Sequence, residues 1–266
     1  MTPQQQSLVD TIRGVLEADA EIEAAWLAGS LGRGGGDAYS DIDILALAKE
    51  GTVAAVARHY LRDVARIAEP ALVNALYGGS ILNVVTRDWR RFDIVFIEAA
   101  DLARYDAARL TPLFNRGDRH PPSPPATPYR ADPDTVQKLV NEYLRILGLL
   151  VVALGREEYL LGLTGLGLMR GLTIDLMLEE NDVAPADRGG ALRRNPLLTE
   201  DQRRDLHTLT PVAATRDGLI AANVALTAIF LPRARRLTKR VGAPWPEVFE
   251  AATSEHLKRN LGLSLD

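Results

Sequence analysis

Two aspartates at spacing i, i+2 are the residues whose types and positions most clearly indicate chemistry. Asp41 and Asp43 stand in the stretch SDIDILALA, at the start of an apolar run. Residues two apart on a strand point to the same face, so we expect the carboxylates side by side, about 6–7 Å apart. Two carboxylates at this separation can share a Mg²⁺ ion, which prefers oxygen ligands and retains water and phosphate oxygens in its shell.

A glycine-rich segment, GSLGRGGGDAYS, precedes these aspartates at residues 29–40. Gly29 would let backbone amides approach an anion closely, and Ser30 adds a hydroxyl donor. Arg33 offers a charged fork that suits phosphate oxygens. Ser40 is either a turn serine or a further nucleotide contact. A phosphate cradle beside metal-binding carboxylates indicates a metal–nucleotide ligand.

A third aspartate lies inside a later apolar run. Asp93, in RRFDIVFIE, has apolar neighbours like those of Asp43. A carboxylate is costly to bury there without a partner, and a metal ion or a role as general base would explain it. The structural alternative is a salt bridge to Arg87, Arg90 or Arg91.

The elements that must position these residues follow from the apolar pattern. Amphipathic spacing predicts helices over residues 4–19 and 53–67. One internal helix among strands that are mostly joined by hairpins favours a mixed sheet over a doubly wound parallel one. The strands are predicted from short apolar runs at residues 24–28, 42–48, 72–77, 81–86 and 92–97.

A proline-rich stretch then separates two halves of different character. RGDRHPPSPPATPYRADP carries six prolines, which forbid a regular helix. We predict an α+β chain, with a mixed-sheet domain over residues 1–115, a linker over 116–131 and an all-α helical bundle over 132–266. The bundle helices are predicted from Asp132 onward and over residues 157–181, 200–209, 217–240 (bent at Pro232) and 246–261.

The helix predicted over residues 157–181 is apolar almost all round, so we expect it in the centre of the bundle core. Arg170 stands among its leucines. A buried guanidinium requires a partner, either an internal carboxylate or a phosphate or substrate group. Glu157 and Asp175 fall on another stripe of this helix and are weaker candidates for substrate contact.

Composition excludes several classes of function. The 266 residues include no cysteine, which rules out disulfides, thiolate zinc sites and a cysteine nucleophile, and the four histidines are scattered. The net charge of -4 makes a grip on long nucleic acid unexpected. The N-terminal residues do not resemble a signal peptide, and the longest uncharged apolar stretch, residues 146–155, is too short to span a bilayer. We expect a cytoplasmic protein without a membrane partner.

An apolar strand, Gly-Ser, a gap of ten residues, Asp-Ile-Asp and a later strand aspartate together resemble the polymerase-β-like nucleotidyltransferase superfamily. The resemblance covers roughly residues 22–100. The helical half is similar to the C-terminal domain of antibiotic nucleotidyltransferases of the lincosamide or aminoglycoside type. The stretches that carry this second likeness are GREEYLLGLTGLGLMRGLTIDLMLEEN and GGALRRNPLLTEDQ.

The resemblance implies that a nucleoside monophosphate, most often AMP from ATP, is transferred to a substrate hydroxyl with release of pyrophosphate. It implies that Gly29, Ser30 and Arg33 hold the triphosphate and that Asp41 and Asp43 carry Mg²⁺. Asp93 would accept the hydroxyl proton or complete a second metal site. In some relatives the base is a glutamate elsewhere, and the reserve candidates are Glu98, Glu157 and Glu158.

The small hydroxylated acceptor, expected between the two domains, is not fixed by the sequence. Nucleotidylation of a protein or RNA is one alternative, although the negative charge disfavours RNA. A non-catalytic nucleotide-binding module is another, although three costly carboxylates disfavour it. The oligomeric state, including a homodimer, is left open.

Overall fold

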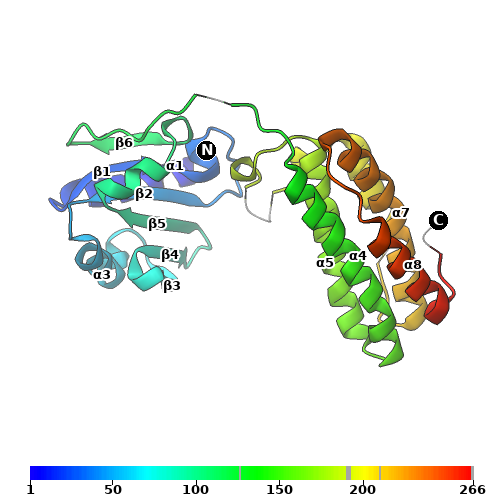
Figure 1. Ribbon diagram of the computed structural model, residues 1–266. Helices are drawn as coiled ribbons and strands as arrows, with labels where there is room; N and C mark the ends of the chain where they lie inside the picture. The colour runs from blue at the N-terminus through cyan, green and yellow to red at the C-terminus, as the bar shows by residue number, and fades with distance from the viewer. Residues whose placement is uncertain (126, 190–192, 210, 265–266) are drawn as a thin grey trace. The chain divides into compact units, whose positions relative to one another are not determined.

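The computed structural model describes residues 1–266 except 126, 190–192, 210 and 265–266 (Figure 1). The chain divides into two compact units, Met1–Ala126 and Thr127–Asp266. The division falls inside the stretch predicted as a linker, of which residue 126 lies outside the described residues. Residues 190–192, within the second stretch that resembles antibiotic nucleotidyltransferases, also lie outside them.

The first unit is built on a mixed sheet, as the sequence predicted, and this sheet has six strands where five were predicted. The strand order is β3-β4-β5-β2-β1-β6, and β2 and β5 pair in parallel while the other neighbours are antiparallel. The strands are β1 (Ile22–Leu27), β2 (Ile42–Ala48), β3 (Pro70–Leu76), β4 (Ile81–Thr86), β5 (Arg91–Ile97) and β6 (Thr111–Asn115). The helices of this unit are α1 (Pro3–Ala18), α2 (Gly29–Gly32) and α3 (Val53–Asp63), with short 3-10 turns between strands.

Two of these elements escaped the sequence prediction. The strand β6 is short, largely exposed at its start and contains Pro112, a residue that strands tolerate mainly at a sheet edge. It pairs only with β1 in the strand order, so it forms such an edge. The helix α2 is a single turn of four residues rich in glycine, a composition that carries no helical periodicity.

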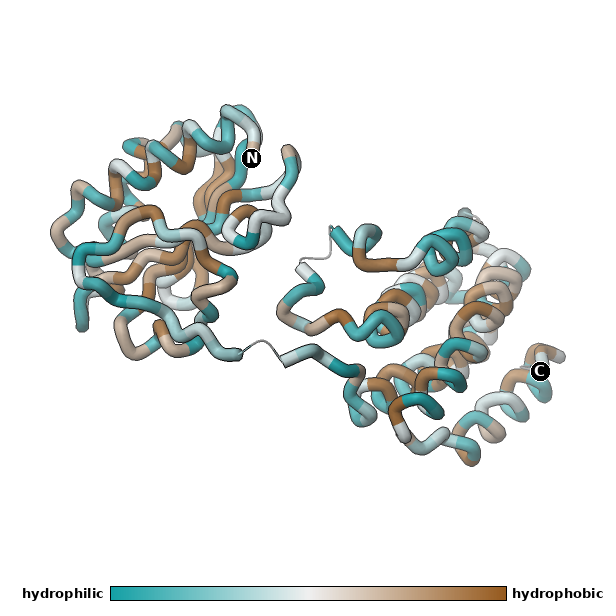
Figure 2. Tube along the Cα trace, turned by 90° about the horizontal axis from the view of Figure 1, so that it is seen from above, coloured by the Kyte–Doolittle hydropathy of each residue, from teal (hydrophilic) through white to brown (hydrophobic). Residues whose placement is uncertain are grey.

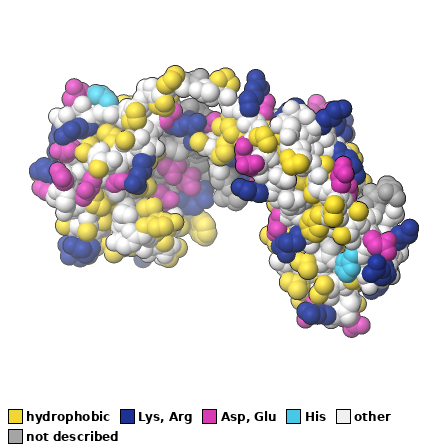
Figure 3. All heavy atoms as spheres, in the orientation of Figure 1, with side chains coloured by type: hydrophobic (Ala, Val, Ile, Leu, Met, Phe, Trp, Pro, Cys, Tyr) yellow, Lys and Arg dark blue, Asp and Glu magenta, His cyan; other side chains and the backbone are white. Residues whose placement is uncertain are grey.

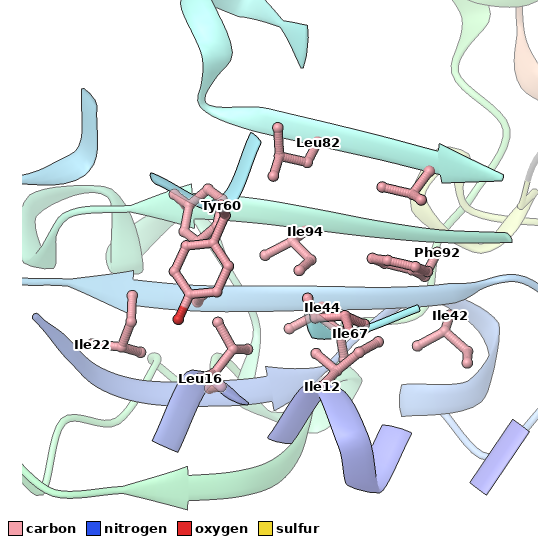
Figure 4. Close-up of a cluster of buried hydrophobic side chains, with 14 of the residues drawn as sticks. Ile12, Leu16, Ile22, Ile42, Ile44, Tyr60, Ile67, Leu82, Phe92 and Ile94 are labelled. Carbon is pink, nitrogen blue, oxygen red and sulfur yellow. The ribbon is translucent and has the colours of Figure 1, made fainter. Parts of the chain in front are cut away.

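One face of the sheet holds the main core of this unit. Helices α1 and α3 cover it, and their side chains interdigitate with those of β2, β4 and β5 (Figure 4). Because side chains alternate along a strand, every second residue of β2 and β5 enters this core and the residues between them point to the other face. The labelled members of the cluster are Ile12, Leu16, Ile22, Ile42, Ile44, Tyr60, Ile67, Leu82, Phe92 and Ile94.

The other face of the sheet is apolar only in part. A smaller buried cluster, which includes Trp26, Leu45 and Leu102, covers it over β1 and the second half of β2. Asp43 and Asp93 point to this same face but lie nearer the beginning of their strands, where they are partly buried. The polar side chains of this face therefore lie beyond the edge of the smaller cluster, near the beginnings of β2 and β5.

The second unit is an all-α bundle, again as predicted. Apolar residues, brown in Figure 2, recur along its helices. The buried core includes Tyr143 of α4 stacked on Phe230 of α7, with ring centroids 3.6 Å apart. Helix α7 continues through Pro232 as one element. The helices are α4 (Pro133–Gly155), α5 (Tyr159–Glu180), α6 (Glu200–His207), α7 (Arg216–Val241) and α8 (Glu247–Leu261).

The expectation that the whole of α5 lies in the core was wrong. Its second half is buried from Leu176 to Glu179, but Leu160, Leu161 and Leu168 in the first half are 75%, 61% and 56% exposed. Apolar composition alone does not tell which turns of a helix have a neighbour. Among the described residues, α5 and α7 are long and apolar enough to cross a membrane by length and composition, a test that core helices also pass.

Candidate active site

The parallel pairing of β2 with β5 places two of the predicted aspartates directly beside each other. Asp43 and Asp93 are register partners across this pair. Both are partly buried, while Ile42 and Phe92, which precede them, are 2% and 0% exposed on the opposite face. The core side chains thus fix the register that brings the two carboxylates together.

The glycine turn that follows β1 lies against Asp43. The amide of Ala28 donates to the carbonyl oxygen of Asp43 at 2.8 Å. Gly29 has a φ of +58°, and a Cβ atom at this position would lie 1.7 Å from Oδ2 of Asp43. Only glycine permits both this backbone conformation and this approach to the carboxylate.

The turn uses the backbone amides that follow Gly29 and Ser30 for its own hydrogen bonds. The backbone N–H groups of residues 32–35 donate to carbonyl oxygens of the same turn. The amides of Gly29 and Ser30 are not among these donors, and the side chains of Ser30, which is partly buried, and Arg33, which is exposed, could join them in binding an anion. The charge of Arg33 already acts on Asp43, where it opposes the rise in pKa that burial and the neighbouring carboxylates cause.

Ser40 closes a turn in the loop that leads into β2. Its hydroxyl accepts from the amide of Asp37 at 3.0 Å and donates to the carboxylate of the same residue at 3.2 Å. The side-chain amide of Gln5 in α1 donates to the carbonyl oxygens of Asp37 and Ser40 at 2.9 and 2.8 Å. This geometry matches the turn alternative, and a nucleotide contact by Ser40 stays a prediction.

Asp41 lies immediately before β2, with its side chain 44% exposed. Nη1 of Arg91, the first residue of β5, is 3.9 Å from Oδ2 of Asp41. Nη2 of the same arginine donates to the carbonyl oxygen of Tyr39 at 3.1 Å. Arg91 therefore holds the end of the loop beside the carboxylates, a role that the sequence did not reveal.

The salt bridge considered for Asp93 is not what the structure records. Arg87 pairs with Glu69 and Arg90 with Asp88, while Arg91 is engaged as described above. The partner of Asp93 is instead a neutral amide.

That amide belongs to Asn83 on β4, a functional candidate that sequence reasoning missed. Its Nδ2 donates to Oδ1 of Asp93 at 2.7 Å, and Asn74 on β3 donates to the Oδ1 atom of Asn83 at 3.4 Å. The signal was a polar residue inside the apolar run ILNVVT, the same pattern that singled out Asp93. One oxygen of Asp93 is thereby occupied, and the carboxylate is held in one orientation.

Burial and the charges of neighbouring carboxylates raise the pKa values of the two strand aspartates. The pKa of Asp43 is raised to about 6, first by burial and then by the charges of Asp41 and Asp93. Burial also raises the pKa of Asp93, while the hydrogen bond from Asn83 opposes that rise. Carboxylates perturbed in this way are typical of functional sites.

The carboxylates fit a divalent cation that is bound together with a substrate. Among the described residues, no three His, Asp or Glu side chains are placed to hold a metal ion by themselves. Mg²⁺, however, is usually held by one or two carboxylates, with water and substrate phosphates completing its shell. Asp41 and Asp43 offer such an incomplete set, and their repulsion is what a cation would relieve.

The remaining predicted residues lie in other places. Glu98 accepts from the amide of Gly51, near the end of β2 opposite to the carboxylates. In the second unit, Glu157 precedes α5 with a φ of +57° and is exposed. Asp175 is paired with Arg194. Arg170 is exposed, so the expectation of a buried guanidinium was wrong.

No family model and no curated protein matches the chain. Among solved structures, the chain is similar to an aminoglycoside 6-adenyltransferase from Bacillus subtilis, with 13% identity, a TM-score of 0.44 and coverage of 95% of this chain and 97% of that one. A nucleotidyltransferase-like protein from Exiguobacterium sibiricum 255-15 shares 13% identity, with a TM-score of 0.34 and coverage of 97% and 88%. Both names belong to the class that the sequence resembles. At these TM-scores, the function of this chain has to be argued from its own residues.

The contact between Gly29 and Asp43 predicts a difference between two glycines of one turn. Gly34 also has a positive φ, +74°, but nothing lies within 4 Å of a Cβ atom there. Alanine at either position incurs backbone strain of roughly 1–2 kcal/mol, and at Gly29 it also collides with the carboxylate. Gly29→Ala should therefore destabilise the protein by about 2 kcal/mol more than Gly34→Ala in urea unfolding, and equal losses would contradict the contact.

The raised pKa of Asp43 predicts how stability depends on pH in the presence of a chelator. Because the folded pKa of about 6 exceeds the ordinary value of 3.8, the folded state binds the proton more tightly, and the contribution of Asp43 to stability falls as pH rises through this window. Asp43→Asn should raise the free energy of unfolding by about 1–2 kcal/mol at pH 7.5 and by little at pH 4.

Urea unfolding at both pH values checks this. Asp10→Asn, at an exposed position of α1, is the matched control and should change stability by less than about 0.5 kcal/mol. An Asp43→Asn variant that is less stable than the parent at pH 7.5 would contradict the electrostatic account.

Proposed function

We propose that the chain is a Mg²⁺-dependent nucleotidyltransferase that moves a nucleoside monophosphate, AMP from ATP in the first instance, to a hydroxyl of a small molecule. The observation that supports this most directly is the register pairing of Asp43 with Asp93 beside the turn at Gly29. A cation-binding carboxylate, a potential proton acceptor and a turn suited to an anion then belong to one site.

The binding roles follow from chemistry and position. Gly29, Ser30 and Arg33 would hold the triphosphate. Asp41 and Asp43 would hold Mg²⁺ together with phosphate oxygens. When bound, the cation supplies neutralisation of the charge on the phosphate oxygens. Arg91, which already offsets the charge of Asp41, adds a second positive group at the rim.

The reaction requires one bond to form and one to break. The acceptor hydroxyl oxygen attacks the α-phosphorus, the bond from this phosphorus to the bridging oxygen breaks, and pyrophosphate leaves. The hydroxyl proton passes to Asp93. Asn83 occupies one oxygen of this carboxylate, and the raised pKa makes the other a better proton acceptor than an ordinary aspartate.

The acceptor that we propose is a hydroxylated antibiotic of the lincosamide or aminoglycoside type, on the basis of the likeness of the helical half. A cytoplasmic setting would provide both ATP and Mg²⁺. In this proposal the three aspartates catalyse the transfer, and other residues determine the specificity for the acceptor.

The direct test is to incubate the protein with Mg²⁺, each labelled nucleoside triphosphate in turn and a panel of hydroxylated antibiotics, and to follow pyrophosphate. We expect release that depends on one antibiotic. Asp43→Asn and Asp93→Asn should each reduce kcat by about 10²–10⁴-fold, whereas Asp10→Asn should not.

Three results would contradict the proposal. Release without any small acceptor, with label on protein or RNA, would indicate a macromolecular acceptor. Nucleotide binding without turnover for any acceptor would indicate a binding module. Full activity of Asp43→Asn would remove this site from the reaction.

The hydrogen bond from Asn83 predicts a separate effect on kcat. Asn83→Leu frees the carboxylate of Asp93, and partners of this kind typically contribute 10–100-fold. We expect kcat to fall by about this factor while the KM for nucleotide stays within twofold. Asn260→Leu, at an exposed position of α8, is the control and should leave kcat unchanged, and an unchanged kcat in Asn83→Leu would contradict the positioning role.

A further inference from the structure

The sheet face that bears the carboxylates continues past Asp93 onto β4 and β3. Asn83 is the register partner of Asp93, and Asn74 is the register partner of Asn83. Together with Asp43, these residues form one row of amides and carboxylates across four strands. Asn83 donates a hydrogen bond to Asp93 at 2.7 Å, and Asn74 donates one to Asn83 at 3.4 Å.

Apolar side chains flank this row on both sides. Leu72 pairs with Val85 on one side, and Leu76 pairs with Ile81 on the other. Leu72 and Leu76 of β3 are 49% and 45% exposed, whereas Leu82 and Val84 of β4, which point to the opposite face of the sheet, are 1% and 0% exposed. Six uncharged side chains thus form an accessible surface, which we call the β3–β4 platform: Leu72, Asn74, Leu76, Ile81, Asn83 and Val85.

The space-filling view agrees with this distribution. Apolar side chains, yellow in Figure 3, gather over the lower part of the sheet unit, where Figure 1 places β3 and β4. Basic side chains, dark blue, also lie along the lower edge of this unit. The six side chains of the platform themselves carry no charge, and Asp93 and Asp43 follow them in the same row.

We propose that the β3–β4 platform binds the acceptor, and that this acceptor is a hydroxylated ring compound with little charge. The inference rests on the proposed function. Hydroxyl groups can exchange hydrogen bonds with the amides of Asn74 and Asn83, while the C–H faces of a ring lie on leucine, isoleucine and valine. Because none of the six side chains is charged, the platform offers no ion pair to a polycation.

The geometry of in-line transfer favours the acceptor over the nucleotide as the molecule bound on the platform. The nucleophile and the leaving group must lie on opposite sides of the phosphorus. The turn at Gly29 to Arg33 follows β1, on the β1 side of Asp43, and the platform extends from Asp93 on the opposite side, toward β4 and β3. With pyrophosphate leaving on the β1 side, an acceptor on the platform places its hydroxyl next to Asp93.

A positive charge introduced on the platform tests whether the acceptor binds there. Leu76→Lys alters an exposed position of an edge strand, where lysine is well tolerated. Leu61→Lys, on α3 with 38% exposure, is the matched control. In the pyrophosphate assay, Leu76→Lys should raise the KM for the acceptor at least tenfold and leave the KM for nucleotide within twofold, and Leu61→Lys should change neither.

A binding measurement keeps this test independent of turnover. Lincomycin, a lincosamide, and kanamycin, a polycationic aminoglycoside, are titrated by calorimetry into the protein with Mg²⁺ and a non-hydrolysable ATP analogue. We expect lincomycin to bind, with a Kd that rises at least tenfold in Leu76→Lys, and kanamycin to bind more weakly. Tighter binding of kanamycin, no binding of lincomycin or an unchanged Kd in the variant would overturn the inference.

Failure of the platform inference can be distinguished from failure of the proposed transferase function. A variant that changes only the KM for nucleotide would assign the platform to the nucleotide and overturn the inference, while pyrophosphate release would leave the transferase proposal intact. Absence of pyrophosphate with every acceptor would remove the proposed function. Lincomycin binding that depends on Leu76 would then still support the platform.

Discussion

The parallel pairing of β2 with β5 is the constraint on which this site depends. Adjacent strands lie about 4.8 Å apart, so register partners of like charge repel each other strongly when they are partly buried. Asp43 and Asp93 are such partners. The pKa values of both are raised, first by burial, and neighbouring carboxylates add to the rise. Two partly buried carboxylates side by side destabilise the folded state. This destabilisation is the main physical reason to assign them a function.

The surrounding structure holds the pair in place from three sides. Below the sheet, the buried side chains of Ile42 and Phe92 fix the register, since a slip by one residue would turn the aspartates into the core. On one flank, Gly29 approaches Asp43 where no other side chain would fit. On the other flank, Asn83 ties Asp93 to β4. The core, the turn and the hydrogen bond therefore hold the same two carboxylates, those of Asp43 and Asp93, in place.

Sequence reasoning anticipated much of this site because its signals are local. The spacing of Asp41 and Asp43, and the similar apolar neighbours of Asp43 and Asp93, predicted strands that bury one face and carry carboxylates on the other. Register could not be read in the same way, since it depends on side chains from distant segments. For this reason Asn83 was missed, and Arg91 was considered as a partner of Asp93 and not of Asp41.

Other differences have equally specific causes. The amides of residues 32–35 are committed to a helical turn, which a run of glycines does not predict. In α5, the exposure of Leu160 and Arg170 depends on which helices pack alongside, and composition does not encode that. Local chemistry was therefore more predictable than the tertiary neighbours of each element.

The most direct test of the central claim is a crystal structure of the protein with Mn²⁺ and a non-hydrolysable ATP analogue, with the metal located by anomalous scattering. The account predicts one Mn²⁺ ion bonded to carboxylate oxygens of Asp41 and Asp43 and to a phosphate oxygen, with the triphosphate beside Ser30 and Arg33. A triphosphate and metal bound elsewhere, with both carboxylates facing only water, would contradict it.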